Sequence, residues 1–123
     1  KRALVVCGAD GMDEITVTGE TKVADWDGGK VSTYTVSPED VGLKRATLEE
    51  LRGGETAEEA AGQVRAILSG ESGPKLDMVL INAGAALMAA GKVDDLAGGV
   101  ALAREVVASG AALAKLEALV AYC

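Results

Sequence analysis

The 123-residue chain has no histidine, no phenylalanine and only three aromatic residues, one tryptophan and two tyrosines. The absence of histidine excludes imidazole acid–base catalysis, serine–histidine triads and most zinc sites. The two cysteines, Cys7 and Cys123, lie at opposite ends of the chain and form no Cys-x-x-Cys pair, which argues against zinc and thioredoxin-type sites. We expect two free thiols rather than a disulfide.

Long apolar runs are also absent. No run approaches the ~20 residues of a membrane span, and no signal peptide is visible. We therefore expect a cytoplasmic protein with no membrane partner. The formal charge of -7 argues against a nucleic-acid partner, because phosphate backbones require clustered cations. An anionic substrate would need a metal ion or a few placed cations to screen the repulsion.

The length suits one domain with a modest core. The chain begins at Lys1 without methionine and passes directly into an apolar strand. Alanine, valine and leucine are abundant, whereas large aromatic anchors are scarce. This composition is typical of one part of a larger core, so we expect a piece of a longer protein.

Two strands are predicted in the first 18 residues. Ala3–Val6 is apolar without alternation, as expected of a strand that is buried on both faces of a parallel sheet. Ile15–Thr18 alternates and is β-branched, which also favours a strand.

A hairpin is predicted next. Its arms are Lys22–Trp26 and Lys30–Val36, joined by Asp27-Gly28-Gly29, a turn sequence that tolerates positive φ. Trp26 and Tyr34 lie on opposite arms, and we interpret them as a cross-strand packing pair.

The remainder of the chain is predicted to be mostly helical. Ser37–Asp40 ends the strand region, and Thr47–Glu50 and Thr56–Glu59 have the spacing of helix capping boxes. Further helices are expected from about Asp95 and over about 111–121. Leu76–Ala90 fits either a strand followed by a loop or one buried helix, and its length favours the helix.

The candidate functional residues are Asp13 and Glu14, on a glycine-rich loop just after the first strand. Two adjacent carboxylates can hold Mg²⁺ beside the phosphates of a substrate. The alternative is that Asp13 caps a turn and Glu14 points to solvent, since other acidic doublets occur in this chain.

Three other motifs are weaker indications of function. Gly8–Gly11 lacks the third glycine and the helix of a dinucleotide-binding fingerprint. Asn82-Ala83-Gly84 is similar to a dehydrogenase motif, but no Tyr-x-x-x-Lys accompanies it, so close helix packing is the simpler reading. Cys7 has no histidine base and is expected to be a small buried residue.

Five segments, taken in order, together span nearly the whole chain: Ala3–Ile15, Ser37–Leu43, Leu51–Glu55, Leu80–Leu87 and Ser109–Leu116. These segments resemble anthranilate phosphoribosyltransferases. Pyrimidine nucleoside phosphorylases share the fold, but the motifs are closer to the anthranilate enzymes.

The resemblance implies an α/β fold: a partial phosphoribosyltransferase or nucleoside phosphorylase-like α/β domain, with a small mixed sheet, a hairpin and then four to five helices. Residues 1–123 would be a single C-terminal part of that domain. Residues 1–36 would form the strand, the Asp-Glu loop and the hairpin, and residues 37–123 would be mostly helical.

The implied reaction joins anthranilate to phosphoribosyl pyrophosphate and releases pyrophosphate, in tryptophan biosynthesis. Asp13 and Glu14 match the acidic pair that serves Mg²⁺ in this family, and they are the implied metal residues. Cys7 stands where the family usually has histidine. The family's diphosphate loop and anthranilate-contacting residues belong to a preceding N-terminal region with no counterpart here.

The implied partners are therefore phosphoribosyl pyrophosphate, anthranilate and the missing N-terminal region. An unpaired apolar strand edge also predicts association, for example as a homo-oligomer. We expect the chain to be inactive by itself. The alternative is a non-catalytic structural or interaction module that keeps the scaffold.

Overall fold

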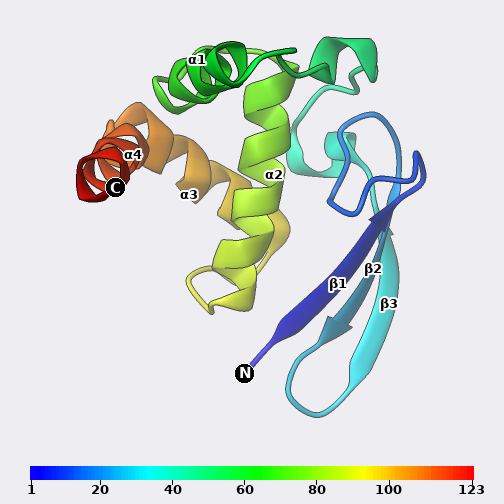
Figure 1. The fold of residues 1–123 in the computed structure, drawn as a ribbon. Coiled ribbons are helices and arrows are strands. Elements are labelled where there is room, and N and C mark those ends of the chain that lie inside the picture. Colours follow the sequence, from blue (N-terminus) through cyan, green and yellow to red (C-terminus); the bar gives the residue numbers. More distant parts are fainter.

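The computed structural model describes residues 1–123 and begins with a three-stranded sheet (Figure 1). Strands β1 (Ala3–Gly8), β2 (Thr21–Trp26) and β3 (Val31–Val36) lie in the order β1-β2-β3, and both pairs are antiparallel. The α/β class and the hairpin are confirmed. The parallel arrangement expected for the first strand is wrong, because its neighbour is β2 of the hairpin.

The burial of β1 alternates along the strand instead of covering both faces. Leu4 and Val6 pack against the core, whereas Val5 faces outward and is 71% exposed. Cys7 is exposed too, so its expected burial is wrong; Cys7 and Cys123 are both free thiols, as expected. An apolar run alone therefore did not determine which face of the strand is covered.

The β2–β3 turn is fixed by Asp27, whose carboxylate accepts hydrogen bonds from the N–H groups of Gly29 and Lys30, each at 3.0 Å. Gly28 adopts φ of 102°, a conformation that favours glycine. The register places Trp26 opposite Val31, and Tyr34 falls on the other face of the sheet. The expected Trp26–Tyr34 pair is therefore wrong.

The predicted strand Ile15–Thr18 is also wrong, because these residues form a buried loop. Its polar backbone groups find partners outside any strand ladder. The N–H of Thr16 donates to Thr21 Oγ1 at 3.0 Å, and Val17 O accepts from the N–H of Ala46 at 2.9 Å. The β-branched side chains thus mark burial rather than extension.

Two 3₁₀ turns, Pro38–Val41 and Glu49–Leu51, lead from the sheet to the helices. The capping box predicted at Thr56 is confirmed: its side chain accepts from the N–H of Glu59, and Glu59 reaches back to Thr56. The four helices are α1 (Ala57–Leu68), α2 (Pro74–Ala89), α3 (Leu96–Ala108) and α4 (Ala111–Tyr122).

Helix α2 confirms that the ambiguous apolar run is one helix, and it stands at the centre of the molecule between the sheet and the other helices (Figure 1). It packs closely against α3 where Gly84 meets Gly99. A Cβ atom at Gly84 would lie 2.7 Å from the backbone nitrogen of Val100. The close packing expected of the Asn82-Ala83-Gly84 motif is therefore present at Gly84.

The core lies between α2, α3 and the loops that follow β1 and β3. All of its members are buried and apolar: Ile15, Val17, Leu43, Leu76, Leu80, Ile81, Ala85, Val100, Ala103 and Val107. None of the four α-helices is by itself long and apolar enough to cross a membrane, and α3 with α4 reaches that length and composition only as a pair bent by 64°.

Candidate functional site

The loop that carries the acidic pair begins with a tight turn at the end of β1. The N–H of Gly8 donates to Met12 O at 2.9 Å, and the N–H of Gly11 donates to Gly8 O at 3.0 Å. Gly11 has φ of 91°, which an L side chain rarely adopts. The glycine-rich sequence thus reverses the chain just before Asp13.

Asp10 fixes this turn from within. Its carboxylate accepts hydrogen bonds from the N–H of Met12 at 3.0 Å, Thr16 Oγ1 at 2.6 Å and Thr18 Oγ1 at 2.5 Å. Partial burial raises the pKa of Asp10, but the hydrogen bonds lower it by more, so the net pKa lies below its ordinary value. Asp10 is therefore charged near neutral pH and ties both sides of the loop together.

Asn82 of α2 fixes the other end of the loop. Its side-chain Oδ1 accepts the N–H of Ile15 at 2.9 Å, and its Nδ2 donates to Ile15 O at 2.8 Å and to Met78 O at 3.0 Å. The Ile15 side chain is 2% exposed and belongs to the core. The residue directly after Glu14 is thus attached to α2 by both its backbone and its side chain.

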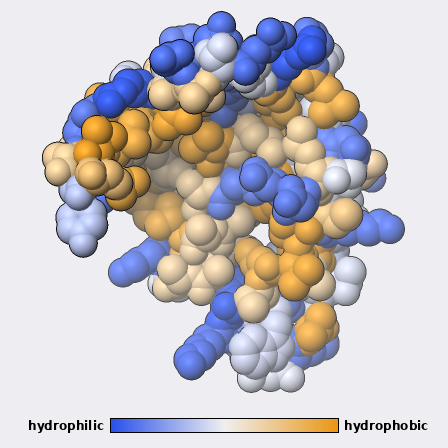
Figure 2. Space-filling model, viewed as in Figure 1, coloured by the Kyte–Doolittle hydropathy of each residue, from blue (hydrophilic) through white to orange (hydrophobic).

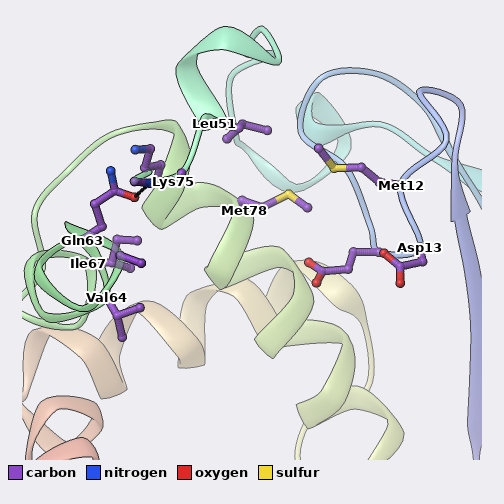
Figure 3. A pocket seen from close by; sticks show the side chains of 12 residues that line it. Met12, Asp13, Leu51, Gln63, Val64, Ile67, Lys75 and Met78 are labelled. Atoms are coloured by element: carbon purple, nitrogen blue, oxygen red, sulfur yellow. Dashed lines mark hydrogen bonds between the residues drawn. The ribbon is translucent and has the colours of Figure 1, made fainter. Parts of the chain in front are cut away.

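Asp13 and Glu14 lie between these two anchors and are exposed. Both line a pocket of about 540 Å³, the larger part of whose wall comes from α1, α2 and the segment before α1. Figure 3 shows Asp13 and Met12 on the loop side, with Met78 projecting from α2 and the α1 residues beyond it. Neither carboxylate takes part in the ion pairs of the chain.

The opposite wall of the pocket is built around the segment before α1. Gly54 donates its N–H to Gln63 Oε1 at 3.1 Å, and a Cβ atom there would lie 2.8 Å from the backbone nitrogen of Ala60. Lys75, at the start of α2, supplies the only positive side chain in the pocket lining. The pocket therefore combines two free carboxylates with one cation.

The donor set suits an open magnesium site. No group of three or more histidine, cysteine or acidic side chains comes together, so the chain forms no closed cage for a metal. Mg²⁺ commonly takes one or two protein carboxylates and completes its shell with water and substrate phosphates. The adjacent, unpaired and exposed pair at Asp13 and Glu14 fits that requirement.

Sequence reasoning missed the two residues that shape the loop. The local pattern indicates only close helix packing at Asn82 and a weak glycine motif around Asp10, and the family resemblance gives neither residue a role. A usable signal existed for Asn82: it is the single polar residue in the apolar run from Met78 to Met88. A lone amide in such a run must find hydrogen-bond partners when it is partly buried.

Residues 1–113 match the family described as "Glycosyl transferase family, a/b domain". The chain belongs to this family. It is 58% identical over 122 residues to the anthranilate phosphoribosyltransferase of Desulfotalea psychrophila and 54% identical over 122 residues to that of Moorella thermoacetica. These alignments cover 99% of this chain but 35% and 36% of the relatives.

Solved structures of anthranilate phosphoribosyltransferases have a similar fold. The anthranilate phosphoribosyltransferase of Thermus thermophilus superposes with a TM-score of 0.87 at 49% identity, covering 98% of this chain and 35% of that one. The Saccharomyces cerevisiae enzyme in complex with PRPP and Mg superposes with a TM-score of 0.80 at 27% identity, covering 93% and 33%. The chain thus spans about a third of the length of its relatives.

Proposed function

We propose that this chain is the C-terminal part of the α/β domain of an anthranilate phosphoribosyltransferase. The intact enzyme would transfer phosphoribose from phosphoribosyl pyrophosphate to anthranilate and release pyrophosphate, in tryptophan biosynthesis. The observation that carries the proposal is the acidic pair, held at a pocket by Asp10 and Asn82, in a chain 58% identical to one such enzyme.

Asp13 and Glu14 would hold Mg²⁺ in this enzyme. When bound, the ion would offset the negative charge that builds on the departing diphosphate. The need for such screening follows from the chain itself, whose formal charge is -7 and whose pocket holds one cation, Lys75. Lys75 would supply a second, weaker attraction for phosphate oxygens.

No side chain here is assigned to general-base catalysis. The nucleophile would be the amine of anthranilate, which attacks the ribose carbon without first losing a proton, and a chain without histidine is compatible with that chemistry. The contribution of this chain would be to place the metal-binding carboxylates and to form one wall of the substrate site.

The remaining parts of the site would come from further protein. The free edge of β1 offers unpaired backbone groups, since its only neighbour in the sheet is β2. A second pocket of about 380 Å³ is lined only by apolar residues of the four helices. Figure 2 shows apolar side chains gathered around α1, α3 and α4. These surfaces support a chain that works joined to an N-terminal region and in a homo-oligomer.

A chimera tests the proposal. The 122 matching residues of the Desulfotalea psychrophila enzyme are replaced by this chain, and the loss of anthranilate fluorescence is followed with phosphoribosyl pyrophosphate and Mg²⁺. The intact relative is the positive control, and the isolated 123-residue chain is the negative control. We expect the chimera to consume anthranilate and the isolated chain to be inactive.

A folded chimera that does not consume anthranilate would overturn the proposed activity and favour a scaffold that has lost its site. Consumption by the isolated chain would overturn the proposed dependence on further protein. Because folding of the chimera is checked by circular dichroism, a failure of assembly is separated from a failure of chemistry.

A further inference from the structure

Asn82 connects α2 to a loop 67 residues earlier in the chain. Its amide pairs with both the N–H and the C=O of Ile15, as a neighbouring strand would, and its third hydrogen bond, to Met78 O, holds the amide in that orientation. A helix side chain that uses both its amide oxygen and its amide nitrogen on one residue of a loop fixes the peptide groups on both sides of that residue.

One of those peptide groups joins Glu14 to Ile15. Since Oδ1 of Asn82 accepts the N–H of that group at 2.9 Å, the direction in which the backbone leaves Glu14 is set by α2. The burial of the Ile15 side chain prevents the segment from sliding along the helix. On the other side of the acidic pair, Asp10 holds the backbone just before Asp13 by accepting the N–H of Met12.

The carboxylates themselves have no such support. Asp13 and Glu14 are exposed and carry like charges side by side, so nothing in their own contacts draws them toward one ion. A loop that had to be ordered by the ion would lose conformational entropy on binding, and the affinity would fall accordingly. A fixed backbone removes that loss before the ion arrives.

We propose that Asn82 is a positioning residue for the metal-binding carboxylates: its amide clamp on Ile15 holds Asp13 and Glu14 in the arrangement that binds a divalent cation. This inference rests on the proposed function in one respect, that the pair holds a divalent cation. The competing account gives Asn82 a role in stability only, in which case its loss weakens the fold without a specific effect on ion binding.

The experiment uses the 123-residue chain and Mn²⁺, which shares the preference of Mg²⁺ for carboxylate and water ligands and is visible by electron paramagnetic resonance. Two quantities are measured: the dissociation constant of Mn²⁺ and the hydrogen-exchange rate of the Ile15 amide by NMR. The variants are Asn82→Ala and Asn82→Ser; a serine in a helix can still bond to the carbonyl four residues earlier, but it is too short to reach Ile15.

Two controls accompany them. Val107→Ala removes buried volume from α3 and lowers stability, but Val107 makes none of the hydrogen bonds of the clamp. The double variant Asp13→Asn with Glu14→Gln removes the ion's ligands and leaves the clamp in place. If Asn82→Ala fails to fold, Asn82→Ser answers the same question, because it retains the bond within α2.

We expect both Asn82 variants to weaken Mn²⁺ binding about 10-fold, the lower end for outer-sphere partners of a metal site. We expect Ile15 to exchange faster in both, and Val107→Ala to change neither quantity specifically. Unchanged Mn²⁺ affinity or unchanged Ile15 exchange in Asn82→Ser overturns the inference, as does an equal loss of affinity in Val107→Ala. If the unsubstituted chain binds Mn²⁺ no better than the double variant, the proposed metal site fails, and the Ile15 exchange still reports whether the clamp exists.

Discussion

Replacing Gly84 with alanine should separate α2 from α3, the helix pair that forms the centre of the core. An alanine Cβ at this position lies 2.7 Å from Val100 N and 2.8 Å from Gly99 C, about 0.7 Å short of the 3.4 Å at which ordinary contact begins. These are backbone atoms of a packed helix, so they cannot move away by a change of rotamer. The two helices must move apart together.

The magnitude follows from two opposing contributions. Alanine is favoured over glycine in a helix interior by about 1 kcal/mol, whereas overpacking a core typically costs about 1–3 kcal/mol. Because the overlap is with backbone, we take the upper part of that range and expect Gly84→Ala to lower the free energy of unfolding by about 1–2 kcal/mol.

Gly62 provides a matched control. It lies inside α1, is exposed, and has nothing within 4 Å of an added Cβ. Gly62→Ala should therefore raise the free energy of unfolding by about 0.5–1 kcal/mol, through helix propensity alone. Urea unfolding followed by circular dichroism measures both variants. Stabilisation by Gly84→Ala comparable to that by Gly62→Ala would refute the close approach of α2 and α3.

Three further predictions concern the same fold. Thr56→Ala should lower the free energy of unfolding in urea by about 1 kcal/mol through loss of the α1 cap, and a change below a tenth of that would contradict the capping box. Ile15→Ala should lower it by about 2–5 kcal/mol, since the side chain is buried; a near-neutral effect would show that the loop is not anchored in the core. The hydrogen bond from Arg2 holds the pKa of Asp25 below its ordinary 3.8. This pair should therefore stabilise the fold above that pH and lose its effect as the pH falls through the lower pKa of the folded state. Asp25→Asn should reduce the loss of unfolding free energy on acidification, and an unchanged loss would contradict the ion pair.

The sequence alone was sufficient to predict the structure where the pattern is local. The turn at Asp27–Lys30, the cap at Thr56 and the single helix over Leu76–Ala90 each depend on residues within a few positions of one another, and all three are confirmed. The order of hairpin before helices follows from the same local signals, whereas the α/β class was implied by the family resemblance.

The sequence alone was insufficient to predict the structure where hydrogen-bond or strand partners lie far apart in the chain. Ile15–Thr18 has strand composition, yet its backbone bonds to Ala46 and Asn82, which no local pattern reveals. The pairing of β1 depends in the same way on where the hairpin folds back. At the site, the acidic pair could be proposed from the sequence because carboxylates on a loop are visible there. The sequence marks Asn82 as a lone amide in an apolar run, but it does not reveal that its partner is Ile15.

The proposed role of Asp13 and Glu14 is to bind the magnesium ion of a phosphoribosyl transfer site. The most direct measurement is the Mg²⁺ concentration at which the chimera consumes anthranilate at half its maximal rate. This concentration is compared between the chimera variants Asp13→Asn and Glu14→Gln and the control variant Asp94→Asn, which alters another exposed acidic doublet. We predict that the first two raise this concentration by more than about 10-fold, since even outer-sphere losses reach that size, and that Asp94→Asn leaves it unchanged. Equal Mg²⁺ dependence in all three variants would contradict the account.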